Sequence, residues 1–325
     1  MTKTKTAARS STRKKPVNGT WKHALQSHKW LYILIIPGVA YMIVFNFLPM
    51  LGLVMAFQDF SPYNGDSAID ALIHSPFVGL DVFKKFFTGP DFWRLLKNTL
   101  SISIASLIFY FPMPIILALL LNEIRCSWYK RVSQTLVYIP HFISMVIVAS
   151  LTYQLFNTSD GYIYHLLQQV MGKNAPDFLS DSGLFVPLIL GQNIWKETGY
   201  GTIIFLAALA GVDVELYEAA RVDGAGRWKQ MWHITLPAIK ATIVIMLILK
   251  VGQILNTGYE QIYLMQNSMN RTVSDVFDTY IYTKGIEGGQ YSLSTAAGLF
   301  KSLVGMIMVI GANKLAKLFG ESGLY

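Results

Sequence analysis

Long apolar stretches separated by polar segments dominate this chain of 325 residues. A helix needs about 20 mostly apolar residues to span a bilayer. Six stretches meet this requirement, at roughly 31–55, 98–121, 137–156, 185–210, 234–254 and 294–315. The pattern predicts an all-α membrane protein with six transmembrane helices. It divides the chain into an N-terminal tail (1–29), a helical domain (30–315) and a short C-terminal tail (316–325).

Composition supports this class. Hydrophobic residues make up 53% of the chain and charged residues 14%, whereas soluble domains carry about 25% charged residues. The net charge of +8 is concentrated in the first 29 residues, which hold eight lysines and arginines and no acid. Such a tail is typical of a cytoplasmic membrane flank, and this placement disfavours nucleic-acid binding. The only cysteine, Cys126, excludes an intramolecular disulfide.

Basic residues also indicate the orientation. With the N-terminus inside, the cytoplasmic segments carry 16 lysines and arginines and the external segments 7. This bias favours both termini in the cytoplasm. The long external segments 56–97 and 255–293 are expected to form short amphipathic pieces. Tyrosines of the second segment, at 259, 263, 280 and 282, have the composition of an interfacial aromatic belt.

The polar segment between the fourth and fifth stretches has structure of its own. Asp213 is a plausible N-cap for a helix over about 214–223. Gly224 and Gly226 should end that helix by adopting conformations closed to other residues, and a second helix should begin near Arg227. Small residues beside Glu218 would let another protein's groove approach closely. The alternative is an ordinary cytoplasmic connection.

The fourth stretch carries charge at membrane depth. Lys196 and Glu197 fall near its middle, so they should face the bundle interior or water. As helix neighbours they point about 100° apart. They therefore suggest a broken helix, with Gly191 and Gly199 permitting the break.

Aromatic and amide side chains accompany these charges. Rings stack on the C–H faces of sugars while amides and carboxylates bond to hydroxyls, so the set suits a sugar path. The candidates are Gln192, Asn193, Trp195, Lys196, Glu197, Tyr200, Gln253 and Asn256. The alternative is that these groups only bond helix to helix. Lysines 240, 250 and 301 lie toward span ends, where we expect them to reach the headgroups.

No motif in the sequence indicates catalysis. It contains no G-x-x-x-x-G-K-[ST] phosphate loop and no histidine or cysteine spacing typical of a metal site. The chain is therefore not expected to be an enzyme, and we expect it to bind no cofactor itself.

The polar loop resembles a known motif. Glu218-Ala219-Ala220, Gly224, Ile234 and Leu236-Pro237 have the residue types and spacing of the EAA loop of permease subunits in binding-protein-dependent ABC importers. Asp223-Gly224-Ala225 is similar to the form found in carbohydrate importers, and Met231 departs from the Phe of many relatives. Asn46-Phe47-Leu48-Pro49-Met50 resembles the branch that imports complex oligosaccharides.

The resemblance implies a type I importer permease in a bacterial cytoplasmic membrane, with a coupling loop at 212–237. A helix of this loop would dock on a cytoplasmic ATPase, which would hold the ATP and Mg²⁺. The coupling residues would be Glu218, Ala219, Ala220, Asp223, Gly224, Ala225, Ile234, Leu236 and Pro237. The implied partners are a second, similar permease, two ATPase subunits, an extracellular solute-binding protein and an oligosaccharide.

Two other classes remain open from the residues alone. An ATP-independent channel or ion-coupled carrier also uses polar residues at mid-membrane depth. A membrane scaffold or receptor would tolerate loss of Trp195 and Glu197 without any effect on uptake.

Overall fold

The computed structural model describes residues 29–320 and 323–324, apart from the side chain of Lys173, and this described part is helical throughout. The predicted basic tail therefore lies almost wholly outside the described residues. One isolated bridge, between Gln58 and Phe77, is the nearest approach to a strand among those residues. The chain divides into two compact units, 1–53 and 54–325. The all-α class expected from the hydrophobic pattern is confirmed.

The described part of the first unit is an apolar helix with a local change of pitch. Its elements are α2 (Lys29–Met42), the π-helical turn η1 (Ile43–Phe47) and α3 (Leu48–Met50). The 3-10 segment η2 (Leu51–Phe57) continues it across the unit boundary, so Lys29–Phe57 is one candidate membrane span of 29 residues.

Two further helices of the described chain are long and apolar enough to cross a membrane: Phe92–Asn122 and Tyr291–Leu318. The first contains α6 (Phe92–Ala105), the π-helical turn η4 (Ser106–Tyr110) and α7 (Pro112–Asn122), and the second is α19. Two bent pairs raise the number of candidate spans from three to as many as five.

Each bent pair contains a sharp break. In the first, α8 (Ser127–Tyr138) and η5 (Ile139–Phe142) meet α9 (Met145–Phe156) at 93°. In the second, Arg227–Ala238 meets α15 (Lys240–Gly252) at 58°. The predicted fourth span corresponds to α11 (Ser182–Ala210), which is not among the candidates although it has 29 residues. Its polar middle lowers its hydropathy.

Short helices occupy the connections, as expected for segments 56–97 and 255–293. They are η3 (Pro62–Asn64), α4 (Ala68–His74), α5 (Asp81–Thr88), α10 (Tyr162–Met171), η6 (Gly172–Asn174), α16 (Tyr259–Met265), α17 (Arg271–Ser274), α18 (Phe277–Tyr282) and η8 (Thr283–Glu287). The π-helical turn η8 leads toward α19 through Gly289, which has φ 66°.

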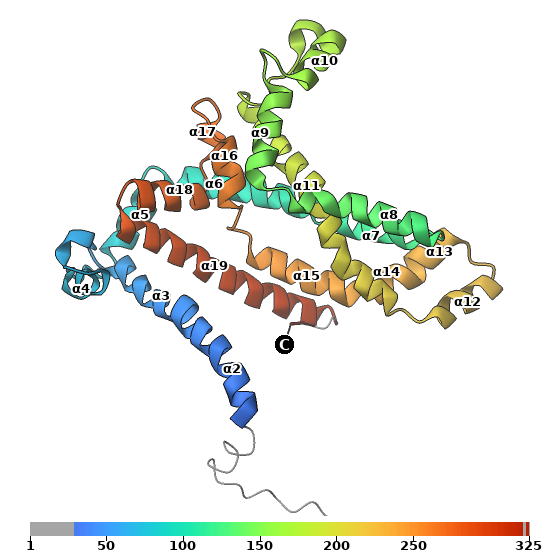
Figure 1. Cartoon of the computed structure of the whole chain (residues 1–325), viewed down its shortest axis with the longest axis horizontal. Coiled ribbons are helices and arrows are strands. Elements are labelled where there is room, and N and C mark those ends of the chain that lie inside the picture. The colour runs from blue at the N-terminus through green and yellow to red at the C-terminus, as the bar shows by residue number, and fades with distance from the viewer. Residues whose placement is uncertain (1–28, 321–322, 325) are drawn as a thin grey trace, which may run out of the picture. The chain divides into compact units, whose positions relative to one another are not determined.

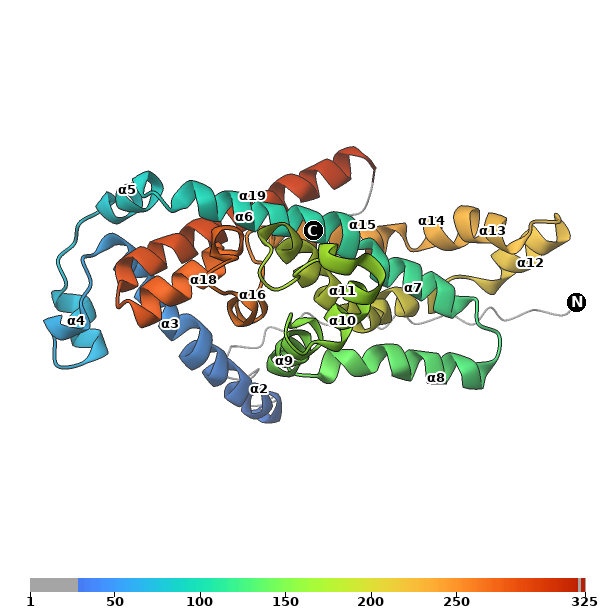
Figure 2. The same cartoon turned by 90° about the horizontal axis from the view of Figure 1, so that it is seen from above.

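Helix α11 lies at the centre of the second unit. It packs along α7 and also contacts α6, α8, η5, α15 and α17 (Figures 1 and 2). Beside it, α15 packs along α19. The prediction of a broken fourth helix is wrong, because α11 runs unbroken through Gly191 and Gly199.

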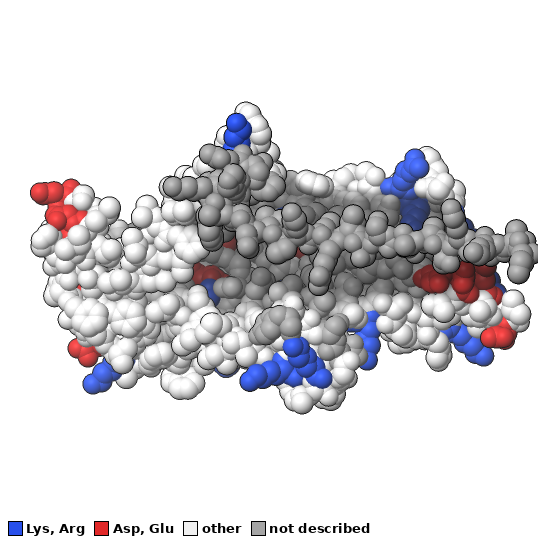
Figure 3. All heavy atoms as spheres, turned by 90° about the horizontal axis from the view of Figure 1, so that it is seen from below, with Lys and Arg blue, Asp and Glu red and all other residues white. Residues whose placement is uncertain are grey.

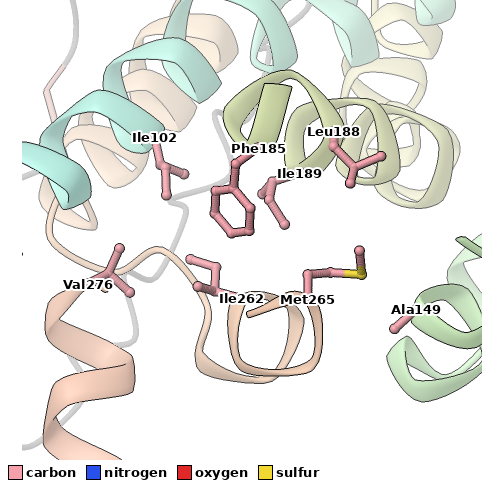
Figure 4. Close-up of a cluster of buried hydrophobic side chains, with 8 residues drawn as sticks. All are labelled: Ile102, Ala149, Phe185, Leu188, Ile189, Ile262, Met265 and Val276. Atoms are coloured by element: carbon pink, nitrogen blue, oxygen red, sulfur yellow. The ribbon is translucent and has the colours of Figure 1, made fainter. Parts of the chain in front are cut away.

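The largest apolar cluster forms around one face of α11. Phe185 and Ile189 of α11 face Ile262 and Met265 of α16, and Ile102 of α6 closes one side (Figure 4). All five side chains are at most 2% exposed. Because α16 follows α15 in the chain, this cluster fixes the segment that leaves α15 against α11.

Glycines permit the closest helix contacts. A Cβ on Gly199 would collide with the backbone carbonyl of Val137 in α8. In the same way, the backbone oxygen of Gly252 in α15 would lie 2.7 Å from a Cβ on Gly305 in α19. Small residues at such contacts are how membrane helices approach one another. Gly199 therefore serves packing, and not the helix break expected from the sequence.

Charge is unevenly distributed over the surface. In the space-filling view most Asp and Glu residues in sight lie toward the two ends, whereas Lys and Arg residues also appear between them (Figure 3).

The glycine contact generates a stability prediction. Gly199→Ala should lower the apparent Tm of the purified protein by about 3 °C or more, because overpacking a tight contact costs about 1–3 kcal/mol. Gly191→Ala is the matched control on the same helix, since a Cβ added at Gly191 would meet nothing within 4 Å. Thermal unfolding in detergent measures both. Equal Tm values for the two variants would contradict the packing role of Gly199.

Candidate functional site

The polar loop after α11 forms two short helices joined by a closed turn. Helix α12 (Val214–Val222) begins at Asp213, whose carboxylate accepts a hydrogen bond from the Glu215 N–H at 2.9 Å. Helix α13 (Arg227–Gln230) follows, then the π-helical turn η7 (Met231–Thr235) and α14 (Leu236–Ala238). The predicted N-cap and both helices are confirmed.

The turn that ends α12 is closed by two backbone hydrogen bonds. The Ala225 N–H donates to the Ala220 carbonyl at 2.8 Å, and the Gly224 N–H donates to the Arg221 carbonyl at 3.0 Å. This is the Schellman pattern, which places a left-handed residue after the helix. Gly224 supplies it with φ 75°. Gly226 has φ −68°, so the expectation that it needs a glycine conformation is wrong.

Side chains that the sequence analysis missed hold the loop together. The Gln230 amide, 9% exposed, donates to the Ala225 carbonyl at 2.8 Å. The hydroxyls of Tyr217 and Thr235 lie 3.0 Å apart and join α12 to η7. The positions of these residues in the sequence follow no periodic pattern, so these contacts can be recognised only in the folded loop.

The loop presents apolar side chains to its surroundings. Val214, Leu216 and Val222 on α12 are exposed, as are Trp228 and Trp232 on the following turns. Glu218 and Ala219 lie exposed among them, and Ala220 is half-buried. Exposed apolar patches of this kind mark interaction sites. Behind them, Ile234 and Leu236 are half-buried and Asp223 and Pro237 are exposed.

The charged residues of α11 form a compact cluster. The Lys196 ammonium donates to Glu197 Oε1 at 2.9 Å and to the His141 carbonyl at 2.8 Å. His141 Nδ1 lies 2.7 Å from Glu197 Oε2. The His141 ring stacks on Tyr200, with centroids 3.9 Å apart and planes 4° apart. Lys196 and Glu197 thus form an ion pair, because their side chains are long enough to meet although they leave α11 at different angles.

Gln192 bridges three helices. Its amide nitrogen donates to the Thr152 hydroxyl of α9 at 2.7 Å, and its oxygen accepts from Gln261 of α16 at 2.9 Å. The Gln261 amide also donates to the Ile189 carbonyl at 2.9 Å. Because Gln192 is only 7% exposed and both ends of its amide are bonded, the geometry favours the helix-bonding alternative for this residue.

The remaining candidates fall in separate places. Asn193, Gln253 and Asn256 line one cavity of about 60 Å³, between α6, α11 and the end of α15. Trp195, 50% exposed, borders an apolar groove against α9. The predicted path residues are therefore not one site but a cavity, a charged cluster and an aromatic rim.

Two lysines, one buried and one half-buried, contradict the expectation that they reach headgroups. Lys301 is 8% exposed and pairs with Asp278. Asp278 also accepts hydrogen bonds from the backbone N–H and hydroxyl of Thr257, at 2.8 and 3.2 Å. Lys250 is half-buried, and its ammonium lies 5.3 Å from the ring centroid of Tyr110. For both residues a partner within the protein replaces the headgroup.

Three of the four tyrosines expected to form an interfacial belt cluster within segment 255–293, and the fourth, Tyr280, packs against Phe86 instead. The rings of Tyr259 and Tyr282 lie 4.5 Å apart, and Tyr263 packs against both. The Tyr263 hydroxyl donates to Glu287 at 2.7 Å. This hydrogen bond to a carboxylate raises the pKa of Tyr263, so its hydroxyl stays protonated at neutral pH.

Among residues 29–320 and 323–324, no group of three or more His, Cys, Asp and Glu side chains is arranged to hold a metal ion. What the chain does offer is a helical scaffold with membrane-length apolar helices, a polar interior and an ordered loop with an exposed apolar face. That combination is typical of a membrane protein that contacts another protein.

Comparison with known proteins identifies the family. Residues 110–320 match the family described as "Binding-protein-dependent transport system inner membrane component", and the chain belongs to it. The chain is 55% identical over 306 residues to Protein LplB of Bacillus subtilis (strain 168), covering 94% of both chains. It is 50% identical over 301 residues to the polygalacturonan/rhamnogalacturonan transport system permease protein YteP of the same strain, covering 93% of this chain and 92% of YteP.

A solved structure has the same fold. A chain of a bacterial alginate ABC transporter, in complex with an alginate pentasaccharide-bound periplasmic protein, matches with a TM-score of 0.83 and 38% identity. The match covers 94% of this chain and 99% of that one. The resemblance inferred from the EAA loop is confirmed: this chain is a permease subunit of an ABC importer, a transport component and not an enzyme.

The buried pair generates a second prediction. Asp278→Asn leaves the Lys301 charge buried without its partner, which should cost about 3–5 kcal/mol of stability. Lys301→Met should act in the same direction. The double variant should lose less than the sum of the two, because the partners act on each other. Denaturation in detergent measures all three.

The control for this cycle is an exposed pair. Asp91→Asn removes an ion pair with Arg94, whose side chain is 44% exposed, and should change stability by about 0–1 kcal/mol. If the stability losses of Asp278→Asn and Lys301→Met were additive in the double variant, the pair would not be the link between Thr257 and α19 that the geometry indicates.

Proposed function

We propose that this chain is one of two permease subunits of an ATP-driven, binding-protein-dependent importer of oligosaccharides. The observation that carries the proposal is the closed α12–α13 turn, with its exposed apolar face, within the region that matches the family. The relatives support carbohydrate as the cargo, because they include proteins of polygalacturonan, rhamnogalacturonan and alginate transport.

The coupling element is the loop 212–237. Its exposed Val214, Leu216 and Val222 would enter a groove of a cytoplasmic ATPase subunit, with Glu218 making a polar contact at the edge. Ala219 and Ala220 permit a close approach. The Schellman turn and the Gln230 hydrogen bond make the loop rigid, so that a displacement imposed on α12 reaches α15 through α13 and α14.

The translocation path follows α11. Asn193, Gln253 and Asn256 would bond sugar hydroxyls from the cavity wall, and Trp195 and Tyr200 offer aromatic faces. Lys196 and Glu197 are half-buried at the middle of the same helix, paired with each other and with His141. Gln192 would support the path by holding α9 and α16 in place.

The assembly consists of this chain, a second homologous permease, two ATPase subunits that hold ATP and Mg²⁺, and an extracellular solute-binding protein. The six-span topology, with α11 as the fourth span, puts both termini in the cytoplasm of a bacterial cell. On this topology residues 1–29 form the basic tail, 30–315 the permease domain and 316–325 the closing tail.

The function can be tested in proteoliposomes. Oligosaccharide uptake should require the ATPase subunits, ATP and the binding protein together, and the sugar-loaded binding protein should raise ATP hydrolysis. Leaving out each component in turn provides the controls. Uptake that persists without the ATPase subunits would reject this proposal in favour of a channel or an ion-coupled carrier.

The coupling element has its own test. Gly224→Val should reduce coupled uptake at least about fivefold, because a left-handed conformation costs a residue with a side chain about 1–2 kcal/mol and displaces α12. Gly226→Val is the matched control, since Gly226 has φ −68° and a Cβ added there would meet nothing within 4 Å. Uptake and stimulated ATP hydrolysis are measured together. Equal effects of the two variants would show that the turn does not transmit the coupling.

A further inference from the structure

One small cavity in the second unit combines polar and apolar walls. Its volume is about 60 Å³. Its polar lining comprises Ser103, Ser106, Asn193, Lys250, Gln253, Asn256 and Thr257.

Ser103 on the cavity wall has an unused hydroxyl. The residue is 9% exposed, and its Oγ has no hydrogen-bond partner among the described residues. Buried polar atoms in native proteins are nearly always bonded, and an exception calls for an explanation. A polar group that enters the cavity would supply the missing partner.

Lys250 gives the cavity its charge. No carboxylate lies within 4.0 Å of its ammonium among the described residues, and no Asp or Glu lines the cavity. The ammonium lies over the Tyr110 ring, which weakly stabilises a cation without neutralising it. A half-buried, unneutralised cation beside an unbonded hydroxyl is complementary to an anion.

An acid that bonds to the cavity lining from outside it already has partners. Asp278 accepts two hydrogen bonds from Thr257, a residue of the cavity lining, and pairs with Lys301. Its negative charge is therefore balanced by Lys301 and not by Lys250. The same contacts hold the segment after α15, and with it the cavity wall, against α18 and α19.

We propose that this cavity is an acidic-sugar subsite, in which Lys250 and Ser103 receive the carboxylate of a uronic acid unit. The proposal rests on the proposed function and makes it more specific. The carboxylate would bond to Lys250 and Ser103, and the amides of Asn193, Gln253 and Asn256 in the same lining would bond ring hydroxyls. Lys250 thereby gives the translocation path a preference for acidic over neutral oligosaccharides.

The test uses the complete transporter in proteoliposomes with its binding protein. The probes are short oligomers of galacturonate, glucuronate and mannuronate, each compared with its methyl ester, which keeps the hydroxyls and removes the charge while adding one methyl group. Lys250→Met should lower kcat/KM for the acids at least about tenfold, because a charge-assisted hydrogen bond is lost. Uptake of the esters should stay within about twofold. Lys250→Arg, which keeps the charge, should retain most of the preference.

Ser103→Ala provides a second variant with little risk to folding, since no hydrogen bond within the protein is lost. It should lower kcat/KM for the acids by about threefold and leave the esters unchanged. Because every variant works with the same binding protein, selection by that protein cancels in the comparison. Equal losses for acids and esters in both variants would overturn the subsite.

If the Lys250→Met transporter does not assemble, the unaltered transporter still tests the proposed subsite. Uptake of esters or neutral oligosaccharides at least as efficient as that of the acids would overturn the subsite while leaving the importer function intact. Inorganic phosphate that alone stimulated ATP hydrolysis through Lys250 would assign the cavity to a free anion instead. If no oligosaccharide, acidic or neutral, were transported, the importer function itself would fail.

Discussion

Polar side chains on α11 must find their partners within the protein, because hydrocarbon offers none. This constraint organises the second unit. Gln192 bonds to Thr152 and Gln261, while Lys196 and Glu197 bond to each other and to His141. These contacts tie α11 to α9, α16 and η5. The apolar cluster around Phe185 and the close approach at Gly199 then lock the helix in the same position. Helix α11 is too polar to span a bilayer by itself, and it is stable here because neighbouring helices supply partners for its polar side chains.

The same constraint bears on the path that we propose along α11. Gln192 has both ends of its amide bonded within the protein, whereas the Ser103 hydroxyl has no partner among the described residues and lines, with Lys250, the cavity between α6, α11 and the end of α15. On the proposed path, groups of this second kind would meet a passing solute. Asp278, which bonds to Thr257 of the same lining, is paired with Lys301.

The loop that we propose as the coupling element meets a different requirement, because in that role it would transmit displacement from an ATPase subunit to the membrane helices. The Schellman turn at Gly224 and the Gln230 hydrogen bond replace the support that a larger core would supply. Because α13 continues through η7 and α14 to the bend at Lys240, the loop and α15 form one mechanical path. The segment after α15 borders the cavity. In the proposed mechanism, a motion of α12 would therefore reach the wall that holds the cargo.

Local sequence determined several features by itself. The apolar runs determine membrane helices, Asp213 determines the start of α12, and Gly224 its end, because each depends on residues within a few positions of one another. The EAA spacing identified the family for the same reason. Only the tertiary structure decided which polar groups have hydrogen-bond or ion-pair partners. Long side chains let Lys196 and Glu197 meet despite their angle on α11, Gly199 serves a contact with a distant carbonyl, and Lys301 finds Asp278 across a turn. Residues that bond to partners far apart in the chain leave no periodic pattern in the sequence. Whether a polar residue of α11 is free to contact a solute or only bonds helix to helix can therefore be decided only from the tertiary structure.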